Sequence, residues 1–308
     1  MHYNIVIVSN EGYIQHAAVM LVSLFTMNKD KHFVIYLLTD GITNATEDKL
    51  REVCDAHQAD LKVIKCGIDN LGDFPVGQWK PIMYFKLLIP QLLPSTEKRC
   101  LFLDVDLVVH DDITSLYEWN LGDNVIAAAE DMPDCVAFKP RLGLKDTDLC
   151  INSGVMVCDL EKWRLMEQKQ PIMAYATNII SIIVNEQDVL ACYFRDKIAL
   201  LPIRWNMTTF YFNRKPKIFS KYLPELEAAK RFPGIIHFAA PIKPWFNDCQ
   251  HPYRKLYKKY LMLTPWKKYH FPIFEQLSGW GRIKKTIRNW LNRIGIIRDG
   301  IFTPPILP

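Results

Sequence analysis

The sequence predicts an α/β protein with a mostly parallel central sheet and a helical, basic C-terminal extension. In the first half of the chain, short apolar runs alternate with amphipathic segments. Nearly all-apolar runs are typical of strands buried on both faces, and their alternation with helices indicates a parallel sheet covered on both sides. From about residue 252 onward the chain becomes helical in pattern, aromatic and basic. We therefore expect one domain over residues 1–251 and an extension over residues 252–308.

The expected elements follow in chain order from the hydrophobic periodicity. Strands are predicted over residues 5–8, 33–38, 61–65, 100–103, 125–129, 154–158, 198–201 and 235–238. Helices are predicted over residues 15–27, 47–57, 84–93, 160–176 and 187–193, and Pro90 should interrupt the third of them because proline lacks an amide hydrogen.

Targeting and cysteine patterns favour a cytoplasmic protein. The apolar run over residues 5–8 is too short for a signal peptide and ends in polar residues. Nowhere do eighteen uncharged apolar residues follow one another, so no transmembrane helix is expected. None of the eight cysteines forms a C-x-x-C pair. Free thiols in a reducing compartment are therefore favoured over a zinc site or disulfides.

Charge is concentrated in the C-terminal extension. Residues 253–308 hold 12 Lys or Arg and 2 Asp or Glu, a net charge of +10. The other 252 residues hold 26 and 31, a net charge of −5, which together give the total of +5. A basic segment on a mildly acidic body predicts an anionic partner, either a membrane surface or a nucleic acid.

Two aspartates follow the predicted strand over residues 100–103. Asp104 and Asp106 stand one residue apart in an otherwise apolar run. On a continuing strand such positions point the same way, so both carboxylates can converge on one cation. Oxygen ligands of this kind suit Mg²⁺ or Mn²⁺, and without a cation the two carboxylates would repel each other. The alternative is that both residues cap a surface turn.

Three further motifs carry polar groups at the ends of predicted elements. His237 ends a short strand and is a candidate metal ligand, and Lys243, six residues further on, can meet a diphosphate. Asn152, Ser153 and Gly154 offer hydrogen bonds and close backbone approach to a sugar. Residues 185–188 precede or begin an apolar helix. Structural roles remain open for each motif: a satisfied histidine, a turn entering a strand, and N-terminal capping of a helix.

Together these motifs resemble the retaining glycosyltransferases of family 8. The matching blocks are L-F-L-D-V-D, I-N-S-G-V, N-E-Q-D-V-L and H-F-A-A-P-I-K-P-W, within a resemblance that covers roughly residues 3–266. The family includes bacterial lipooligosaccharide galactosyltransferases, lipopolysaccharide core glucosyltransferases and glycogenin. The segment 251–257 with Thr264-Pro265-Trp266 is similar to the C-terminal extension of the lipopolysaccharide glucosyltransferases.

The resemblance implies a GT-A type nucleotide-binding domain and retaining transfer of a hexose. The donor would be UDP-glucose or UDP-galactose, and the acceptor a lipopolysaccharide-type or other glycan or glycolipid. It also implies that Asp104, Asp106 and His237 bind Mn²⁺ or Mg²⁺. Gln187, Asp188 and Asn152 would act at the donor sugar, with Gln187 beneath the anomeric carbon. The residues that would bind the nucleotide-sugar and its cation are Val8, Asn10, Tyr13, Lys86, Asp104, Val105, Asp106, Ser153, Gly154, Ala240 and Lys243.

Four positions depart from the family pattern. The family usually has Asp where Asn10 stands, Arg at Lys86, Gly at Ala240 and Asp at Glu186. These departures leave the base and the donor sugar open. The matched metal ligands are unchanged, so we expect an active enzyme.

The end of the chain predicts an interfacial helix. One stripe carries apolar side chains and the remaining surface carries cations, the pattern of a helix that lies on an anionic membrane. The stripe comprises Trp280, Ile283, Ile287, Trp290, Leu291 and Ile294, and the cations are Arg282, Lys284, Lys285, Arg288 and Arg293. We therefore expect a cytoplasmic protein peripheral to the inner face of the membrane.

Three other interpretations stay open. The stripe can instead pack on the catalytic domain or on a second subunit. The basic, aromatic tail can bind nucleic acid beside a domain that senses a nucleotide, although we do not expect nucleic acid as a partner. The enzyme can also glucosylate itself in the manner of glycogenin.

Overall fold

The protein has the predicted α/β architecture in its computed structural model, which describes residues 2–72, 74, 81–131, 135–213, 220–274, 279–293 and 296. A seven-stranded sheet has the order β3-β2-β1-β4-β7-β6-β8. The sheet is mostly parallel, and only β7 runs antiparallel to its neighbours β4 and β6. Its strands are β1 (His2–Val8), β2 (His32–Thr39), β3 (Asp60–Lys65), β4 (Arg99–Leu103), β6 (Ile126–Glu130), β7 (Ile151–Asp159) and β8 (Ile198–Leu200).

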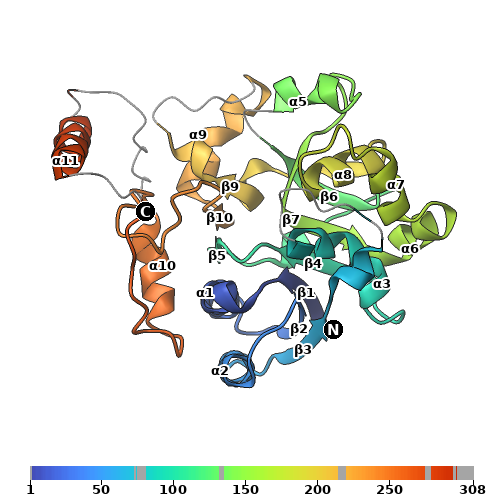
Figure 1. Cartoon of the computed structure of the whole chain (residues 1–308), viewed down its shortest axis with the longest axis horizontal. Coiled ribbons are helices and arrows are strands. Elements are labelled where there is room, and N and C mark those ends of the chain that lie inside the picture. Colours follow the sequence, from blue (N-terminus) through green and yellow to red (C-terminus); the bar gives the residue numbers. More distant parts are fainter. Residues whose placement is uncertain are drawn as a thin grey trace.

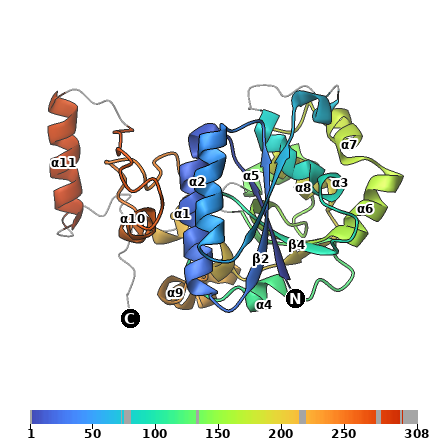
Figure 2. The ribbon, with the colours of Figure 1, turned by 90° about the horizontal axis from the view of Figure 1, so that it is seen from below.

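Helices cover both faces of this sheet (Figure 2). Helices α1 (Ile14–Met27) and α2 (Asn44–Asp55) lie on one face, and α6 (Leu160–Lys169), α7 (Ile172–Asn178) and α8 (Glu186–Tyr193) lie on the other. Within β1, Ile5 and Ile7 join the core beneath α1, whereas Val6 joins the core on the opposite face. Burial on both faces is the reason why the strand is continuously apolar.

A second, three-stranded sheet carries part of the polar residues of interest (Figure 1). It contains β5 (Leu107–Val109), β10 (Ile235–His237) and β9 (Met207–Thr208), with β10 in the centre. The chain passes directly from β4 through residues 104–106 into β5, and His237 pairs with Leu107. This register places His237 beside the predicted aspartate pair.

Several elements differ from the expectation because of proline and local pairing. The helix predicted over residues 84–93 is a 3₁₀ helix, η3 (Pro81–Leu88), followed by the short α3 (Ile89–Leu92). The helix predicted over residues 160–176 divides at Pro171, which cannot continue the hydrogen bonding of α6. The strand predicted from Gly154 begins at Ile151, since residues 151 and 152 already pair with β6.

Short helical segments complete the fold. They are η1 (Glu11–Tyr13), η2 (Ile68–Leu71), α4 (Thr114–Tyr117), α5 (Cys135–Arg141), η4 (Ile203–Asn206), η5 (Thr209–Phe212), η6 (Ser220–Tyr222) and α9 (Leu223–Arg231). The seven cysteines whose side chains are described are buried and form no disulfide bond.

The C-terminal extension has two helical parts. Helix α10 (Arg254–Leu261) buries Tyr257 and Tyr260 in the same core as α1. Helix α11 (Gly279–Arg293) stands beyond α10 in both ribbon views (Figures 1 and 2). The described part of the chain contains no helix with the length and apolar composition needed to cross a bilayer. The division at residue 251/252 stays a prediction, and α10 shares its core with the domain before it.

Candidate active site

The polar motifs converge at one edge of the main sheet. Strands β1, β4 and β6 end at this edge, and the antiparallel β7 begins there. The amide of Asp104 donates to the carbonyl of Gly154 at 2.8 Å, which joins the end of β4 to the start of β7. The carboxyl ends of parallel strands are where open α/β sheets bind ligands.

A pocket of about 320 Å³ opens at this edge. Its lining contains the predicted Val8, Asn10, Tyr13, Lys86, Asp104 and Val105, together with Ser9, Ile82, Met83 and Glu186. Segments far apart in the chain therefore form one concave surface. The sequence singled out Glu186 as a departure from the family pattern, and the structure places it in the pocket wall.

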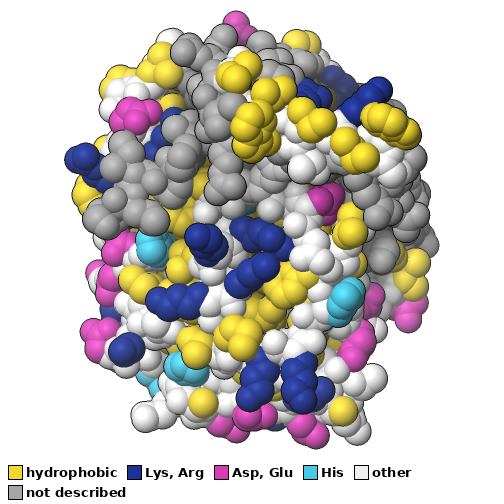
Figure 3. Space-filling model, turned by 90° about the vertical axis from the view of Figure 1, so that its left-hand side faces the viewer, with side chains coloured by type: hydrophobic (Ala, Val, Ile, Leu, Met, Phe, Trp, Pro, Cys, Tyr) yellow, Lys and Arg dark blue, Asp and Glu magenta, His cyan; other side chains and the backbone are white. Residues whose placement is uncertain are grey.

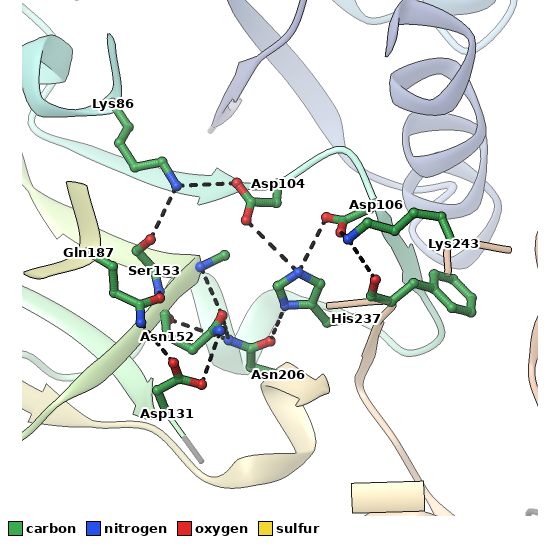
Figure 4. Close-up of polar contacts among 12 residues, drawn as sticks. Lys86, Asp104, Asp106, Asp131, Asn152, Ser153, Gln187, Asn206, His237 and Lys243 are labelled. Carbon is green, nitrogen blue, oxygen red and sulfur yellow. Dashed lines mark hydrogen bonds and ion pairs between the residues drawn. The ribbon is translucent and has the colours of Figure 1, made fainter. Parts of the chain in front are cut away.

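Asp104, Asp106 and His237 form a cluster with the geometry of a metal site (Figure 4). Their candidate ligand atoms all lie within 4.8 Å of one another. His237 Nε2 is 3.3 Å from Asp106 Oδ1 and 3.9 Å from Asp104 Oδ2. Two carboxylates and an imidazole fit a divalent cation such as Mn²⁺ or Mg²⁺.

Gly154 is required by this close packing. A Cβ atom at residue 154 would lie 2.4 Å from His237 Cε1 and 2.9 Å from Asp104 Oδ2. Any other residue would therefore enter the space in which the candidate ligands meet. This observation supports a built metal site rather than a chance surface cluster.

Two lysines neutralise the acidic groups. Lys86 is buried and contacts Asp104 at 3.3 Å and Glu186 at 3.0 Å. Burial alone would lower the pKa of Lys86, but the two carboxylates outweigh burial and raise the pKa above its ordinary value. Lys243 Nζ lies 2.5 Å from Asp106 Oδ2 and 2.9 Å from the carbonyl of Phe238. Burial alone would raise the pKa of Asp106, yet the ammonium group of Lys243 holds this pKa well below its ordinary value.

The residues that were predicted to act at the donor sugar lie in a series of hydrogen bonds (Figure 4). Gln187 accepts from the Ser153 amide at 3.0 Å and donates to Asp131 at 2.8 Å. Asp131 also accepts from Asn152 at 3.4 Å. Asn206 donates to Asn152 Oδ1 at 2.8 Å and contacts His237 Nδ1 at the same distance. This series therefore connects Gln187 to the candidate metal ligand His237.

Two of these residues were missed from the sequence. Asp131 directly follows β6, so a polar residue after a buried strand was the available signal. Asn206 is the last residue of η4, directly before the two-residue β9, and no local pattern distinguishes it.

Two predicted site residues, Asp188 and Ala240, belong neither to the pocket lining nor to the contacts described above. Asp188 Oδ2 accepts from Arg141 at 2.9 Å and from the Val184 amide at 2.7 Å, so this oxygen holds neighbouring segments together. Ala240 lies in the turn between His237 and Lys243, and its amide donates to Phe238 at 2.8 Å. Their roles at the donor stay predictions.

Aromatic side chains connect the pocket to the C-terminal extension. The buried His16 ring stacks on Trp245 at 3.6 Å between centroids, and Tyr13 meets Trp245 edge-on. His16 Nδ1 lies 2.7 Å from the Tyr257 hydroxyl of α10. Burial lowers the pKa of His16 to about 3, partly opposed by Asp106, so its imidazole is neutral near pH 7.

Comparisons with known proteins identify the family. The model of glycosyl transferase family 8 matches residues 4–249. The chain therefore belongs to this family, as the resemblance of its motifs implied.

Individual relatives align with most of this chain. General stress protein A of Bacillus subtilis is 28% identical over 89% of this chain and 98% of its own length. Lipopolysaccharide 1,2-glucosyltransferase of Escherichia coli K12 is 28% identical over 83% of this chain and 76% of its own length.

Solved structures share the fold at low sequence identity. The galactosyltransferase LgtC, solved with donor and acceptor sugar analogs, superposes with a TM-score of 0.73 at 20% identity, over 91% of this chain and 99% of the other. The glycosyltransferase GlyE of Streptococcus pneumoniae gives a TM-score of 0.64 at 22% identity, over 87% and 62%. These likenesses confirm the predicted GT-A type fold.

Proposed function

We propose that the protein is a metal-dependent, retaining hexosyltransferase that moves glucose or galactose from a UDP-sugar to a glycan or glycolipid acceptor. The observation that carries the proposal is the Asp104, Asp106 and His237 cluster beside a pocket of about 320 Å³. Two of the four proteins named above are a lipopolysaccharide glucosyltransferase and a galactosyltransferase, and these names support a hexose donor and a lipopolysaccharide-type acceptor.

The pocket chemistry supports a uracil base. Oδ1 of Asn10 is buried and finds no hydrogen-bond partner in the described structure. An unsatisfied acceptor is costly, and the N3–H of uracil would satisfy it. Tyr13 lines the same pocket and remains 44% exposed, so its ring is available for stacking on the base.

The charges support a departing diphosphate. A divalent cation on the cluster would neutralise the nucleoside diphosphate as a Lewis acid. Lys243 and Lys86 add positive charge beside Asp106 and Asp104, where preorganised electrostatics favour a leaving anion.

Retention of the anomeric configuration is what the resemblance to the retaining glycosyltransferases of family 8 implies. Oε2 of Glu186 is buried in the pocket wall without a partner among the described residues, so it can accept a hydrogen bond from a sugar hydroxyl. Gln187 is a carboxamide and a poor nucleophile. The acceptor would therefore attack on the face from which the diphosphate leaves, and a diphosphate oxygen would take the acceptor proton.

A donor panel tests this function. UDP-glucose, UDP-galactose, GDP-mannose and ADP-glucose are incubated with the enzyme, with and without Mn²⁺ and without acceptor. We expect Mn²⁺-dependent release of UDP from one of the two UDP-hexoses. Preference for another base would overturn the nucleotide assignment. Proton NMR of the glycosylated product then shows whether the anomeric configuration is kept, and an adduct trapped on Gln187 would contradict direct attack.

The C-terminal face supports attachment to an anionic membrane. In α11, Trp280 is 75% exposed, Trp290 is 58% exposed, and Ile283 and Ile287 are each 50% exposed. Figure 3 shows Lys and Arg gathered on the same side of the molecule, which carries α10 and α11. An exposed apolar stripe beside basic residues suits an interfacial helix. The predicted Ile294 lies outside the described residues.

Liposome sedimentation tests the attachment. Removal of residues 279–308 should abolish binding to phosphatidylglycerol-containing liposomes and preserve hydrolysis of the donor. Neutral phosphatidylcholine liposomes are the control, because the cations should not bind them. A truncated protein that still sediments would contradict the role of α11, and one that unfolds would place the helix in the fold instead.

A further inference from the structure

A chain of hydrogen bonds of fixed direction ends at His237. The Gly154 amide can only donate, and it lies 3.1 Å from Oδ1 of Asn152. That contact identifies the Asn152 atom as an acceptor. The same oxygen lies 2.8 Å from the side-chain amide of Asn206, which must therefore present its NH₂ group to Asn152. The backbone carbonyl of Asn152, at 3.4 Å from the same NH₂ group, also can only accept.

The direction of this chain determines the tautomer of the histidine. With its NH₂ group on Asn152, Asn206 turns Oδ1 toward His237 Nδ1 at 2.8 Å. An oxygen at this position requires a hydrogen on Nδ1. The neutral imidazole then has its lone pair on Nε2, the atom that faces Asp104 and Asp106. A metal ligand needs that lone pair.

Burial and packing hold the arrangement in place. Asn206 is completely buried and His237 is 3% exposed, so water does not compete for these hydrogen bonds. Met207, the next residue after Asn206, pairs with Ile236 in β9 and β10. The backbone register thus sets Asn206 beside His237, and an alternative rotation of either side chain would leave a buried polar group unsatisfied.

We propose that Asn206 is a positioning residue that holds His237 as the Nδ1–H tautomer and so prepares Nε2 for the divalent cation. The proposal deepens the proposed function, because it rests on the same metal site. It assigns to Asn206 a contribution to metal affinity without direct contact with the cation. Groups that orient a ligating histidine typically change metal affinity by about 10- to 100-fold.

Two variants separate this role from simple structural support. Asn206→Ala removes both the acceptor for His237 and the donor to Asn152, and should weaken Mn²⁺ binding by about 10- to 100-fold. Asn206→Asp keeps an acceptor for Nδ1–H but loses the donor to Asn152. If Asn206 acts through His237, the Asp variant should bind Mn²⁺ within a few-fold of the wild type, or more tightly. If it only supports Asn152, both variants should weaken binding alike, which would overturn the proposal.

NMR of the metal-free protein reads the tautomer directly. Protein labelled with ¹⁵N-histidine at pH 8 should show His237 protonated on Nδ1, with its signals identified by comparison with His237→Gln. Protonation on Nε2 in the wild type would overturn the proposal, even if the variants failed to fold. Absence of Mn²⁺ binding to the wild type would instead refute the metal site of the proposed function, and the NMR measurement would still decide the tautomer.

Discussion

Substitution of Gly154 by Ala tests how closely the candidate metal ligands are packed. The new Cβ would lie 2.4 Å from His237 Cε1 and 2.9 Å from Nδ1 of the same ring, about 1 Å inside ordinary van der Waals contact. His237 cannot retreat freely because Asn206 holds its ring. Gly154 lies in β7 outside the left-handed region, so alanine fits the backbone. The expected effect is therefore confined to the site.

A displacement of about 1 Å at a catalytic centre costs on the order of 100-fold, or about 2.7 kcal/mol. We expect the Gly154→Ala enzyme to lose about 100-fold in kcat/KM for donor hydrolysis, and to bind Mn²⁺ more weakly by calorimetry. Gly67→Ala is the matched control, since its nearest neighbour would lie 4.0 Å from the new Cβ. A folded Gly154→Ala protein with wild-type Mn²⁺ affinity would refute the packing argument.

Three further predictions concern charge and protonation. Asp106→Asn should remove most donor hydrolysis at an unchanged melting temperature, and full Mn²⁺-dependent turnover would contradict its role as a ligand. Lys243→Met should weaken UDP binding yet strengthen Mn²⁺ binding to the free enzyme by about tenfold or more. The reason is that Lys243 pairs with Asp106 at 2.5 Å and its charge repels a second cation. Equal losses of both affinities would contradict this competition. The pKa of His16 is about 3 in the folded state and about 6.5 when unfolded, so its contribution to stability is full above pH 6.5 and is lost as pH falls toward 3. Urea unfolding at pH 7 and pH 5 should show that this group lowers the free energy of unfolding by about 2 kcal/mol at the lower pH. The difference between the two pH values should be smaller by that amount in His16→Phe, and an unchanged difference would refute the role of His16.

The sequence was informative where function coincides with a local pattern. One short segment contains both the apolar strand β4 and the two aspartates, Asp104 and Asp106, that follow it. Because β4 is buried on both faces, its apolar run shows in the sequence where the strand ends and the aspartates begin. His237 was found because it ends an apolar run. The mostly parallel arrangement of the strands could also be predicted, because continuous apolar runs are typical of buried parallel strands.

Long-range contacts could not be predicted in this way. Asn206 contacts His237 across 31 residues of sequence, and Asp131 contacts Gln187 across 56 residues. Neither residue belongs to a periodic pattern. Asn206 reaches its partner through the pairing of β9 with β10, and Asp131 reaches its partner through its place at the end of β6. The split between α6 and α7 was missed for a different reason. The apolar periodicity continues through Pro171, but the backbone cannot.

The most direct test of the central claim is the position of manganese in a crystal of the enzyme grown with MnCl₂ and UDP. Anomalous scattering should place one Mn²⁺ between Asp104, Asp106 and Nε2 of His237, with UDP in the pocket lined by Asn10 and Tyr13. Bound UDP with Mn²⁺ at another set of side chains, or with no Mn²⁺ at all, would contradict the account.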